Sequence, residues 1–382
     1  MNKTVTSAQL REQNAGRVLK YVYDLGDVSR QELVQALGIS LPTVTRDLRC
    51  WVDRGVVTLR GHYDSTGGRR AQIYSFNGTQ RVAVGISVRR EYFHICAVDL
   101  YGRAVLSLEE QIPFSETEEY FALIGSRLEG LIIAAGLKKE QVLGVSLAVQ
   151  GLVSPDGESI LFGRILGCDG TGILRRFSRY IPYECSMMHD TEASALAEIF
   201  HRKEMKNAVL LYLNRHFGGA AVTEGRVYQD SGFSSSVIEH MTLHPGGLRC
   251  YCGRRGCIEA YCSAEALGRR AGKKLPEFFA AVRDGEEKAG ETWEEYLREL
   301  AAVIGNLRMV MDTEFILCGD MIRFVTDQDL TRLREKVDAG CAFEAAPVRI
   351  GKSGYTEDAA AIGAGISLTR PYVQALLNMK QE

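Results

Sequence analysis

The 382-residue chain lacks the long apolar stretches that mark membrane-spanning and secreted proteins. No run of about 18 apolar residues occurs in it, and its first twenty residues, MNKTVTSAQLREQNAGRVLK, contain no apolar core of a signal peptide. Its content of 46% hydrophobic and 25% charged residues is ordinary for a globular protein, and its length suffices for two or three domains. We therefore expect a cytoplasmic protein with no membrane partner.

Cysteine is sparse outside one segment. Residues 239–262, EHMTLHPGGLRCYCGRRGCIEAYC, hold four of the ten cysteines and two of the seven histidines. Because thiols stay reduced in the cytoplasm, this cluster predicts a metal or redox site rather than disulfide bonds.

The net charge of −2 is unevenly divided along the chain. Residues 1–78 contain eleven Lys and Arg against seven Asp and Glu, a net charge of +4, which leaves −6 for the remainder. A small basic unit on a larger acidic body favours an N-terminal part that meets a polyanion.

Short helices are predicted between residues 14 and 61. One ends near residue 26, and the next has Ser29 as its N-cap, Glu32 as capping-box partner and Gly38 as its end. A third helix has Pro42 in its first turn and an apolar stripe of Val44, Leu48 and Val52.

The segment VVTLRGHYDSTGGRRAQIYSFN then alternates as a hairpin does, with two glycines near its tip. Helices followed by a two-stranded wing indicate a winged helix-turn-helix domain over residues 1–78. Its third helix would present hydroxyls and two arginines to base edges, while wing arginines contact phosphates or the minor groove. The candidate DNA contacts are Ser29, Arg30, Ser40, Pro42, Thr43, Thr45, Arg46, Arg49, Arg69 and Arg70. The alternative is a small protein-interaction domain with a solvated basic face.

Beyond residue 80 a strand-turn-strand pattern occurs twice. VAVGISVRREYFHICAVDLYGRAVLSLEE and AVLLYLNRHFGGAAVTEGRVYQD share this rhythm, and each is accompanied by helical sequence. Two α/β lobes with a cleft between them are the expected result, at residues 79–200 and 201–382. The C-terminal helix is a candidate to return to the first lobe. Residues 283–299 predict an exposed, charged helix.

Three cysteines, Cys250, Cys252 and Cys257, form a C-x-C-G-x-x-G-C pattern that suits a metal ion. Tetrahedral zinc needs one more ligand, and spacing alone does not choose between His240 and His244. Four protein ligands would leave no open position for an activated water, so the pattern predicts structural zinc rather than a hydrolase. The alternative is three thiols without a metal.

These segments together resemble the ROK family (repressor, open reading frame, kinase), in particular its regulators with an N-terminal winged helix. The resemblance covers nearly the whole chain and rests on SRQELVQALGISLPTVTRDL, GGRRAQIYSFN, the cysteine motif ending GCIEAY, HDTEASALAE, EFILCGD and AAAIGAGISL. It implies a two-lobed, actin-like sugar-kinase fold with structural zinc, and it favours His240 over His244 as the fourth ligand.

Kinases of this family have Asp-x-Gly-Gly-Thr in the first hairpin. This chain has Ser87 in place of the aspartate, Arg89 and Arg90 in place of the glycines, and Glu91 in place of the threonine. The second phosphate loop, Gly-Thr-Gly in the family, is replaced by residues 214–216, Asn-Arg-His. Bulky side chains should keep the backbone from closing on phosphate, and losing the aspartate removes the expected Mg²⁺ partner. We therefore expect no kinase activity.

The sugar side of the site is partly retained. Asp190 stands at the position of the family's catalytic base, and His240 and Glu259 match two further sugar contacts. His189 replaces an asparagine, and Glu239 is a candidate to compensate for a glutamate that the family has nearby. These five residues form the expected effector site for a sugar or sugar derivative. The alternative is that Asp190 only caps its helix and that the pocket has decayed.

The main hypothesis is a sugar-responsive transcriptional regulator, of repressor type, that binds a pseudo-palindromic operator as a homodimer or homotetramer. The competing hypotheses are a sugar kinase with an appended DNA-binding domain and a DNA-binding protein that responds to no ligand.

Overall fold

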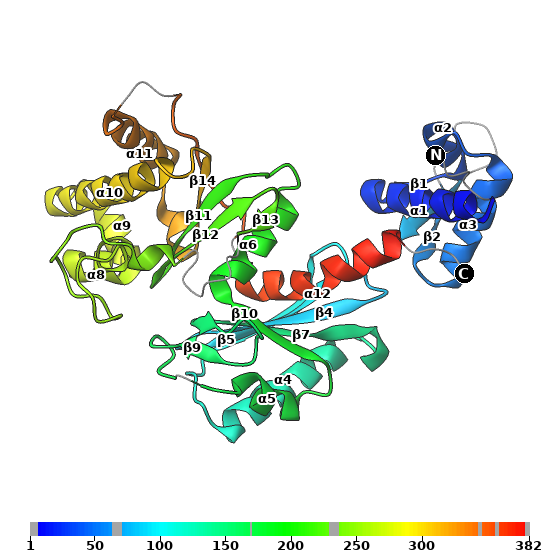
Figure 1. Ribbon diagram of the computed structural model, residues 1–382, viewed down its shortest axis with the longest axis horizontal. Coiled ribbons are helices and arrows are strands. Elements are labelled where there is room, and N and C mark those ends of the chain that lie inside the picture. Colours follow the sequence, from blue (N-terminus) through cyan, green and yellow to red (C-terminus); the bar gives the residue numbers. More distant parts are fainter. Residues whose placement is uncertain are drawn as a thin grey trace, which may run out of the picture.

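The computed structural model describes residues 7–62, 71–168, 170–228, 237–342, 346–355 and 359–378. An N-terminal domain lies at one end of an elongated molecule, and the rest forms two lobes joined by central helices (Figure 1). Within these residues, no helix combines the length and apolar character needed to cross a membrane.

The N-terminal domain has the winged helix-turn-helix arrangement that the sequence predicts. Its elements are α1 (Ser7–Leu25), β1 (Asp27–Val28), α2 (Arg30–Leu37), α3 (Leu41–Asp53), β2 (Val57–His62) and β3 (Gln72–Phe76). Strand β3 pairs antiparallel with both β2 and β1. Ser29 and Glu32 form the predicted capping box of α2, and Gly38 ends this helix with a φ of 65°, a conformation that glycine adopts without strain.

Three details of this domain differ from the sequence prediction. Helix α1 begins at Ser7, well before residue 14. On α3 the buried apolar stripe runs through Val44, Leu48 and Trp51, while Val52 is only half-buried. The indole N–H of Trp51 donates to the carbonyl of Ala15, which fixes α3 against α1. Strand β1 was not predicted, because two residues carry too little pattern.

The first lobe consists of a mixed sheet with helices on its outer face. Its elements are β4 (Val82–Val88), β5 (Phe93–Asp99), β6 (Ala104–Glu110), α4 (Glu118–Ala134), η1 (Lys139–Gln141), β7 (Val142–Val149), β8 (Leu152–Val153), β9 (Ile160–Phe162), α5 (Ile173–Phe177), η2 (Ser178–Tyr180) and β10 (Cys185–His189). The sheet order is β10–β7–β4–β5–β6. The apolar face of α4 packs on this sheet around Phe121, Ile124 and Leu128.

The second lobe follows helix α6 (Asp190–His201). Its elements are β11 (Ala208–Leu213), β12 (Phe217–Thr223), β13 (Arg226–Val227), η3 (Ile238–His240), α7 (Glu259–Cys262), α8 (Ala264–Ala271), α9 (Leu275–Arg283), α10 (Glu287–Arg308), β14 (Glu314–Cys318), η4 (Asp320–Phe324), α11 (Asp327–Ala339) and β15 (Ile350–Lys352). Its sheet order, β13–β12–β11–β14–β15, repeats that of the first lobe when that sheet is read from β6 to β10. In both sheets the first three strands are antiparallel and the last two run parallel to the first. The repeated pattern in the sequence therefore reflects a repeated topology.

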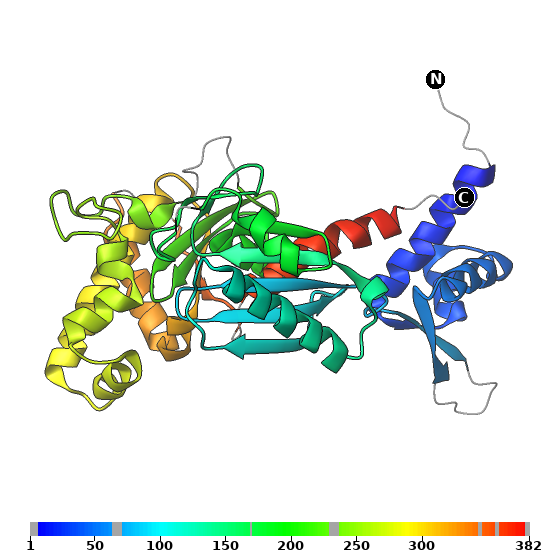
Figure 2. The ribbon, with the colours of Figure 1, turned by 90° about the horizontal axis from the view of Figure 1, so that it is seen from below.

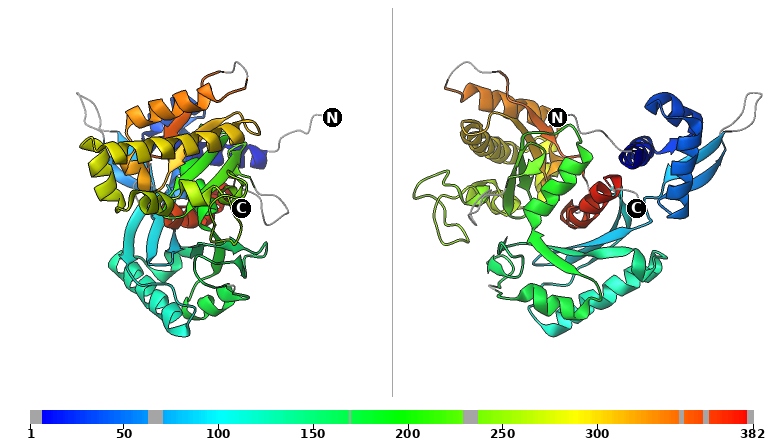
Figure 3. Two further views of the ribbon diagram at one scale, coloured as in Figure 1. Left: turned by 90° about the vertical axis from the view of Figure 1, so that its left-hand side faces the viewer. Right: turned by 45° about the vertical axis from the view of Figure 1, so that its right-hand side comes forward.

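The final helix, α12 (Ala359–Leu377), joins all three parts of the molecule. It packs against α6 and lies on the first-lobe sheet, and its C-terminal end contacts α1 (Figures 1 to 3). Glycines make this close packing possible. A Cβ on Gly363 would lie 1.7 Å from the carbonyl oxygen of Ala193 in α6, and one on Gly85 would lie 1.7 Å from that of Ala361. Val373 and Leu376 complete the apolar core of the N-terminal domain.

Helix α10 is not the exposed helix that the charged sequence of residues 283–299 predicts. Trp293, Tyr296 and Leu297 are almost fully buried in the second-lobe core. The Trp293 indole donates to Asp329, and the Tyr296 hydroxyl donates to the carbonyl of Cys262. The prediction was wrong because charged residues on the outer face outnumber the apolar residues of the inner face.

Candidate effector site, metal cluster and DNA-facing helix

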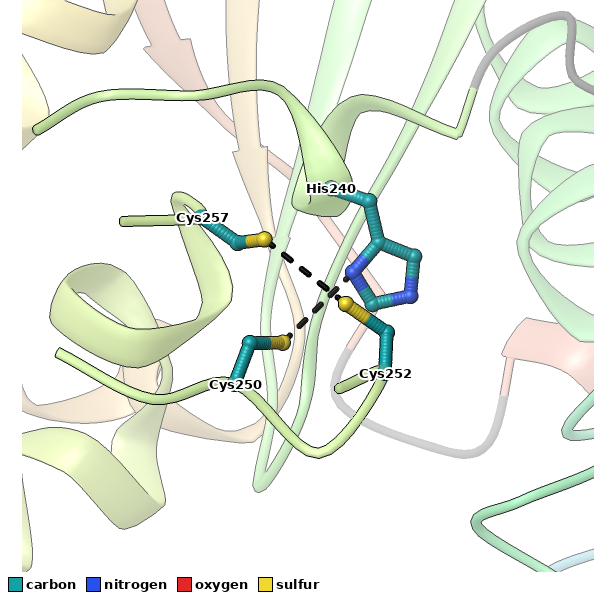
Figure 4. A group of neighbouring side chains, drawn as sticks. All are labelled: His240, Cys250, Cys252 and Cys257. Atoms are coloured by element: carbon teal, nitrogen blue, oxygen red, sulfur yellow. Dashed lines mark hydrogen bonds between the residues drawn. The ribbon is translucent and has the colours of Figure 1, made fainter. Parts of the chain in front are cut away.

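Four side chains of the second lobe converge as a candidate metal centre. His240, Cys250, Cys252 and Cys257 each offer one ligand atom, and these atoms all lie within 4.8 Å of one another (Figure 4). The Cys250 sulfur lies 3.7 Å from Nδ1 of His240, and the sulfurs of Cys252 and Cys257 are also 3.7 Å apart. Burial raises the pKa of the Cys250 thiol and lowers the pKa of His240 to about 4.

Glycine lets the backbone turn tightly around this cluster. Gly253 and Gly256 have φ values of 94° and 82°, which other residues adopt only with strain. A Cβ on Gly256 would also lie 1.8 Å from the carbonyl oxygen of His244.

The two other candidates in this segment lie apart from the cluster. His244 bonds through Nε2 to Glu299 of α10 at 2.7 Å, and its ring packs against Tyr261. Cys262 is fully buried in the second-lobe core. The geometry therefore groups His240, and not His244, with the cysteines.

A cavity lies between the lobes beside the metal cluster. Its volume is about 80 Å³, which is enough for several water molecules but below the roughly 300–1,000 Å³ of typical small-molecule sites. The lining combines residues of both lobes: Gln150, Gly151, Leu152, Phe162, Arg164, Ile165, His189, Asp190, Thr191, Tyr212, Asn214, His216, Phe217, Gly218, Val237, Glu239, His240 and Tyr251. Four of the five predicted effector residues are among them.

Glu259, the fifth, does not line the cavity. Its carboxylate accepts the backbone N–H of Phe217 at 2.6 Å, and its other oxygen lies 2.9 Å from Nδ1 of His216. His216 lines the cavity in its place. The expected direct effector contact is therefore corrected: Glu259 reaches the cavity only through the histidine that it orients.

Asp190 is the first residue of α6, and the N-cap position belongs to His189. No side-chain cap hydrogen bond is made by His189, whose Nδ1 bonds instead to Thr191 at 2.8 Å. The Asp190 carboxylate faces the cavity, 3.3 Å from Nε2 of His189. The alternative in which Asp190 serves as the helix cap does not match this geometry, although a negative charge in the first turn still favours the helix.

Glu239 presents a buried carboxyl to the same cavity. Burial, together with the charges of Asp190 and Glu259, raises the pKa of Glu239 to about 8. Its Oε2 is buried and has no hydrogen-bond partner among the described residues. An unpartnered buried polar atom is costly unless something else occupies the site.

Aromatic rings connect the lobes at this point. The imidazole of His240 lies edge-on between Tyr251, at a centroid distance of 5.1 Å, and Phe162 of the first lobe, at 6.2 Å. Tyr251 also contacts the ring of His216 at 5.4 Å. Since Phe162 ends β9 of the first lobe, any separation of the lobes would open this ring contact.

A second, larger opening of about 670 Å³ lies on the other side of Tyr212 and Asn214. The two degenerate phosphate loops meet at this cleft, where Arg215 of the second loop pairs with Glu91 of the first and with Glu265. Arg89 lines the cleft and lies over the ring of Tyr92. Ser87, at the family's aspartate position, is fully buried in β4.

On α3, the residues proposed to face DNA lie largely on the exposed side. Leu41, Pro42, Arg46 and Arg49 are exposed, and Thr43 and Thr45 are half-buried. The Ser40 hydroxyl lies 2.9 Å from that of Thr43. The two arginines differ in their surroundings.

Arg46 donates from Nε and a terminal nitrogen to one oxygen of Asp47, at 2.9 and 2.7 Å, and Asp47 is fully buried. Arg49 is 84% exposed, and within the described residues its one ion pair is with Asp53, at 4.0 Å. Arg49 is therefore the freer of the two guanidinium groups.

The remaining predicted DNA contacts are held by the domain itself or lie outside the described residues. Ser29 is buried as the N-cap of α2. Arg30 donates to the Tyr74 hydroxyl at 2.7 Å and to Gln72 at 3.1 Å, which ties α2 to the wing strand β3. Arg69 and Arg70 fall in the segment 63–70, which is not among the described residues.

Sequence reasoning missed the aromatic wall of the cavity and the position of His216 in its lining. Tyr251 is the central residue of the C-x-C motif, so its position between two ligands was available as a signal. His216 was noted only as a replaced loop residue. Phe162 and Arg164 lie in a segment that carries no recognisable motif.

The chain belongs to the ROK family. The model of this family matches residues 83–370. Among curated proteins, the DNA-binding transcriptional dual regulator NagC of Escherichia coli K12 is 24% identical over 266 residues, which is 68% of this chain and 65% of NagC. The xylose repressor of Bacillus subtilis 168 is 26% identical over 263 residues, covering 68% of this chain and 67% of that protein.

Solved structures show the same fold. A ROK family transcriptional regulator, described as a homologue of the E. coli Mlc protein, superposes with a TM-score of 0.74 at 21% identity over 97% of this chain and 98% of that one. A ROK hexokinase from Thermus thermophilus superposes with a TM-score of 0.64 at 21% identity, over 77% of this chain and 99% of that one. The similarity to both structures confirms the predicted ROK fold. Because one is a regulator and the other a kinase, the fold is shared by both classes.

Proposed function

We propose that this chain is a sugar-responsive, DNA-binding transcriptional regulator of repressor type that acts in the cytoplasm. The observation that carries the proposal is the continuous path from the cavity to the DNA-binding domain. Asp190 at the start of α6 lines the cavity, α6 packs on α12, and α12 ends in the core of the N-terminal domain. The names of NagC and the xylose repressor agree with this function.

The small volume of the cavity explains how effector binding would change the conformation of the protein. A cavity of about 80 Å³ is smaller than typical ligand sites, so a sugar must widen it. Widening separates Phe162 from His240 and Tyr251 and moves the lobes relative to each other. Because helices are stiff, α6 and α12 transmit this movement to the winged domain, and the effector thereby shifts the balance between DNA-binding and released states.

The metal cluster supports the cavity wall. Zinc–sulfur and zinc–nitrogen bonds of about 2.3 and 2.0 Å place tetrahedral ligands roughly 3.5–3.8 Å apart, and the two separations of 3.7 Å lie within this range. The residues therefore suit a structural zinc ion held by His240, Cys250, Cys252 and Cys257. A zinc ion held by Nδ1 of His240 would fix this ring, which also lines the cavity and would there be able to contact the effector.

Operator recognition requires two copies of the chain. One recognition helix reads too few base pairs to specify a genomic site, so a homodimer or homotetramer binding a pseudo-palindromic operator is the arrangement that fits. The exposed face of α3 would enter the major groove. Arg49 is the better-placed base contact, and Arg46 would have to leave Asp47 to reach a base.

Phosphoryl transfer is not part of this proposal. Such catalysis depends on closely placed backbone N–H groups and a metal-binding carboxylate, whereas Arg89 and the Arg215–Glu91 pair occupy the loop positions. The competing function, a sugar kinase with a DNA-binding domain, is tested by ATP consumption across hexoses and amino sugars. Sustained turnover with any of them would replace this proposal.

The direct test combines ligand binding with DNA release. Operator DNA is first selected from a random pool with the full-length protein, and a sugar library is then screened by thermal shift and by fluorescence anisotropy. At least one sugar should raise the melting temperature and change operator affinity. If sugars raise the melting temperature but none of them changes operator affinity, a regulatory role is contradicted. Complete indifference to the library would favour a DNA-binding protein without an effector.

A further inference from the structure

A third cavity lies where the N-terminal domain meets the body. Its volume is about 420 Å³, within the roughly 300–1,000 Å³ of small-molecule sites. Its walls come from α1, the turn between β5 and β6, the end of α6, the segment after β15 and the start of α12. The lining residues on which the argument rests are Tyr23, Tyr101, Arg103, His201, Lys203 and Tyr355.

The charge of this lining is of one sign. Arg103, His201 and Lys203 are basic and exposed, and the described lining residues include no carboxylate. This stands out because residues 79–382 carry a net charge of −6. The C-terminus of α6 contributes only about half a negative charge, against two permanent positive charges from Arg103 and Lys203.

Asp24 and Asp99, the two carboxylates whose charges act on Tyr23, are engaged elsewhere. Asp24 pairs with Lys20 at 2.9 Å. Asp99 accepts the backbone N–H groups of Tyr101 and Arg103 at 2.9 Å each and shapes their turn. Neither carboxylate lines the cavity. An anion there would therefore meet the guanidinium and ammonium groups without a competing carboxylate from these two residues.

Aromatic side chains form the remaining walls. Tyr101 stacks on Tyr23 with a centroid distance of 5.0 Å, and the Arg103 guanidinium lies over the Tyr101 ring. The rings of His201 and Tyr355 are 5.5 Å apart. Flat rings beside an arginine and a lysine suit a compact molecule that carries both a phosphate and an organic part, because guanidinium groups bind phosphate in a bidentate manner.

We propose that this junction cavity, lined by Arg103, His201 and Lys203, binds a small phosphorylated metabolite distinct from the sugar effector. A ligand bound in this cavity would contact α1, the first lobe and the end of α6 at the same time. Because α6 runs about 18 Å from Asp190 to His201, its two ends face the two cavities. The junction ligand would therefore stabilise one placement of the winged domain and modulate the response to the effector.

Calorimetric titration of the full-length protein with inorganic phosphate, at constant ionic strength, tests the site. Saturable binding with a dissociation constant of about 10 mM or tighter is expected. It should weaken at least about tenfold in the Arg103→Gln/Lys203→Gln variant. The Arg175→Gln/Lys139→Gln control removes the same charge from exposed first-lobe positions and should bind as the wild type does. Absence of saturation, or equal weakening in the control, overturns the proposal.

Two further measurements show where the anion binds and whether the ligand is a sugar phosphate or free phosphate. Ala104→Glu adds a carboxylate to the lining without removing a contact and should also abolish binding, whereas Asp190→Asn should leave it unchanged. Loss of phosphate binding in Asp190→Asn would place the anion in the effector cavity and overturn the proposal. Tighter binding of glucose 6-phosphate than of phosphate supports a sugar phosphate, and equal binding supports free phosphate at the same site. Glucose alone should not bind there.

Discussion

The effector cavity and the neighbouring cleft share Tyr212 and Asn214 but differ in what surrounds them. The cavity is small and retains Asp190 and His240, one of the four candidate metal ligands. The cleft is large, and the loops that hold phosphates in family kinases are tied together here by Arg215 and Glu91. One side of the lobe junction thus keeps chemistry suited to a sugar, while the other replaces a phosphate cradle with an ion pair.

This difference shows how a kinase fold can serve as a switch. In the regulator proposed here, lobe movement, which a kinase uses to enclose its substrates, would transmit ligand binding without phosphoryl transfer. What must persist is a contact that senses the ligand and a stiff connection to the DNA-binding domain. In the proposed function, Asp190 on α6 would make the first contact, and the packing of α6 on α12 would supply the second requirement.

The largest expected effect follows from removing a metal ligand. Cys252→Ser should lower zinc content to well below one ion per chain and reduce the free energy of unfolding by about 3–5 kcal/mol, because the loop loses its cross-link. Metal analysis and chemical denaturation measure the two effects. Cys262→Ser, from the same segment, should keep its zinc. A stable, metal-free Cys252→Ser protein would show that the cluster does not hold the cavity wall.

Asp190→Asn should have the next largest effect, on effector binding. A hydrogen bond to a charged group contributes about 1.5–3 kcal/mol, so effector affinity should fall roughly 10- to 100-fold while stability changes little. Calorimetry with the sugar identified by screening measures this. Asp284→Asn, an exposed position on the second lobe, is the matched control. An unchanged sugar response would remove Asp190 from the effector site.

Strong local patterns made much of the fold predictable. The capping box of Ser29 and Glu32 and the repeated strand-turn-strand pattern of both lobes indicated their elements from local sequence. The burial of Trp293 and Tyr296 was not predictable in this way. Their surroundings are created by helices distant in sequence, and the local composition of α10 is dominated by its charged outer face.

The candidate site also has parts that local sequence predicts and parts that depend on distant contacts. The candidate metal ligands are close in sequence and were predictable up to the choice between His240 and His244. The spacing left this choice open, the family resemblance favoured His240, and the structure groups His240 with the three cysteines. The position of Glu259 behind His216 depends on the packing of α7 against β12, about forty residues away in the sequence. Only the structure shows this position. The DNA contacts proposed for α3 stay a prediction, sharpened by the Arg46–Asp47 pair.

Glu259→Gln should have a smaller effect than Asp190→Asn, because Glu259 acts on the cavity through His216. Loss of the charged partner should allow the imidazole to turn, and effector affinity should fall about three- to tenfold, roughly 0.6–1.4 kcal/mol. Glu299→Gln removes another glutamate–histidine pair, with His244, away from the cavity. If the two variants bind the effector equally well, His216 takes no part in recognition.

The smallest effect is expected at the ion pair that replaces the phosphate loops. Arg215 and Glu91 are both about half exposed, and such pairs contribute only about 0.2–1 kcal/mol. Arg215→Gln should therefore change stability little, yet shift effector affinity up to about fivefold, because the pair joins the lobes. Lys273→Gln, which removes an exposed pair within the second lobe, should leave effector affinity unchanged. A double-mutant cycle with Glu91→Gln measures the coupling free energy between Arg215 and Glu91 for effector binding. A coupling free energy of zero would mean that this ion pair does not link lobe movement to effector binding.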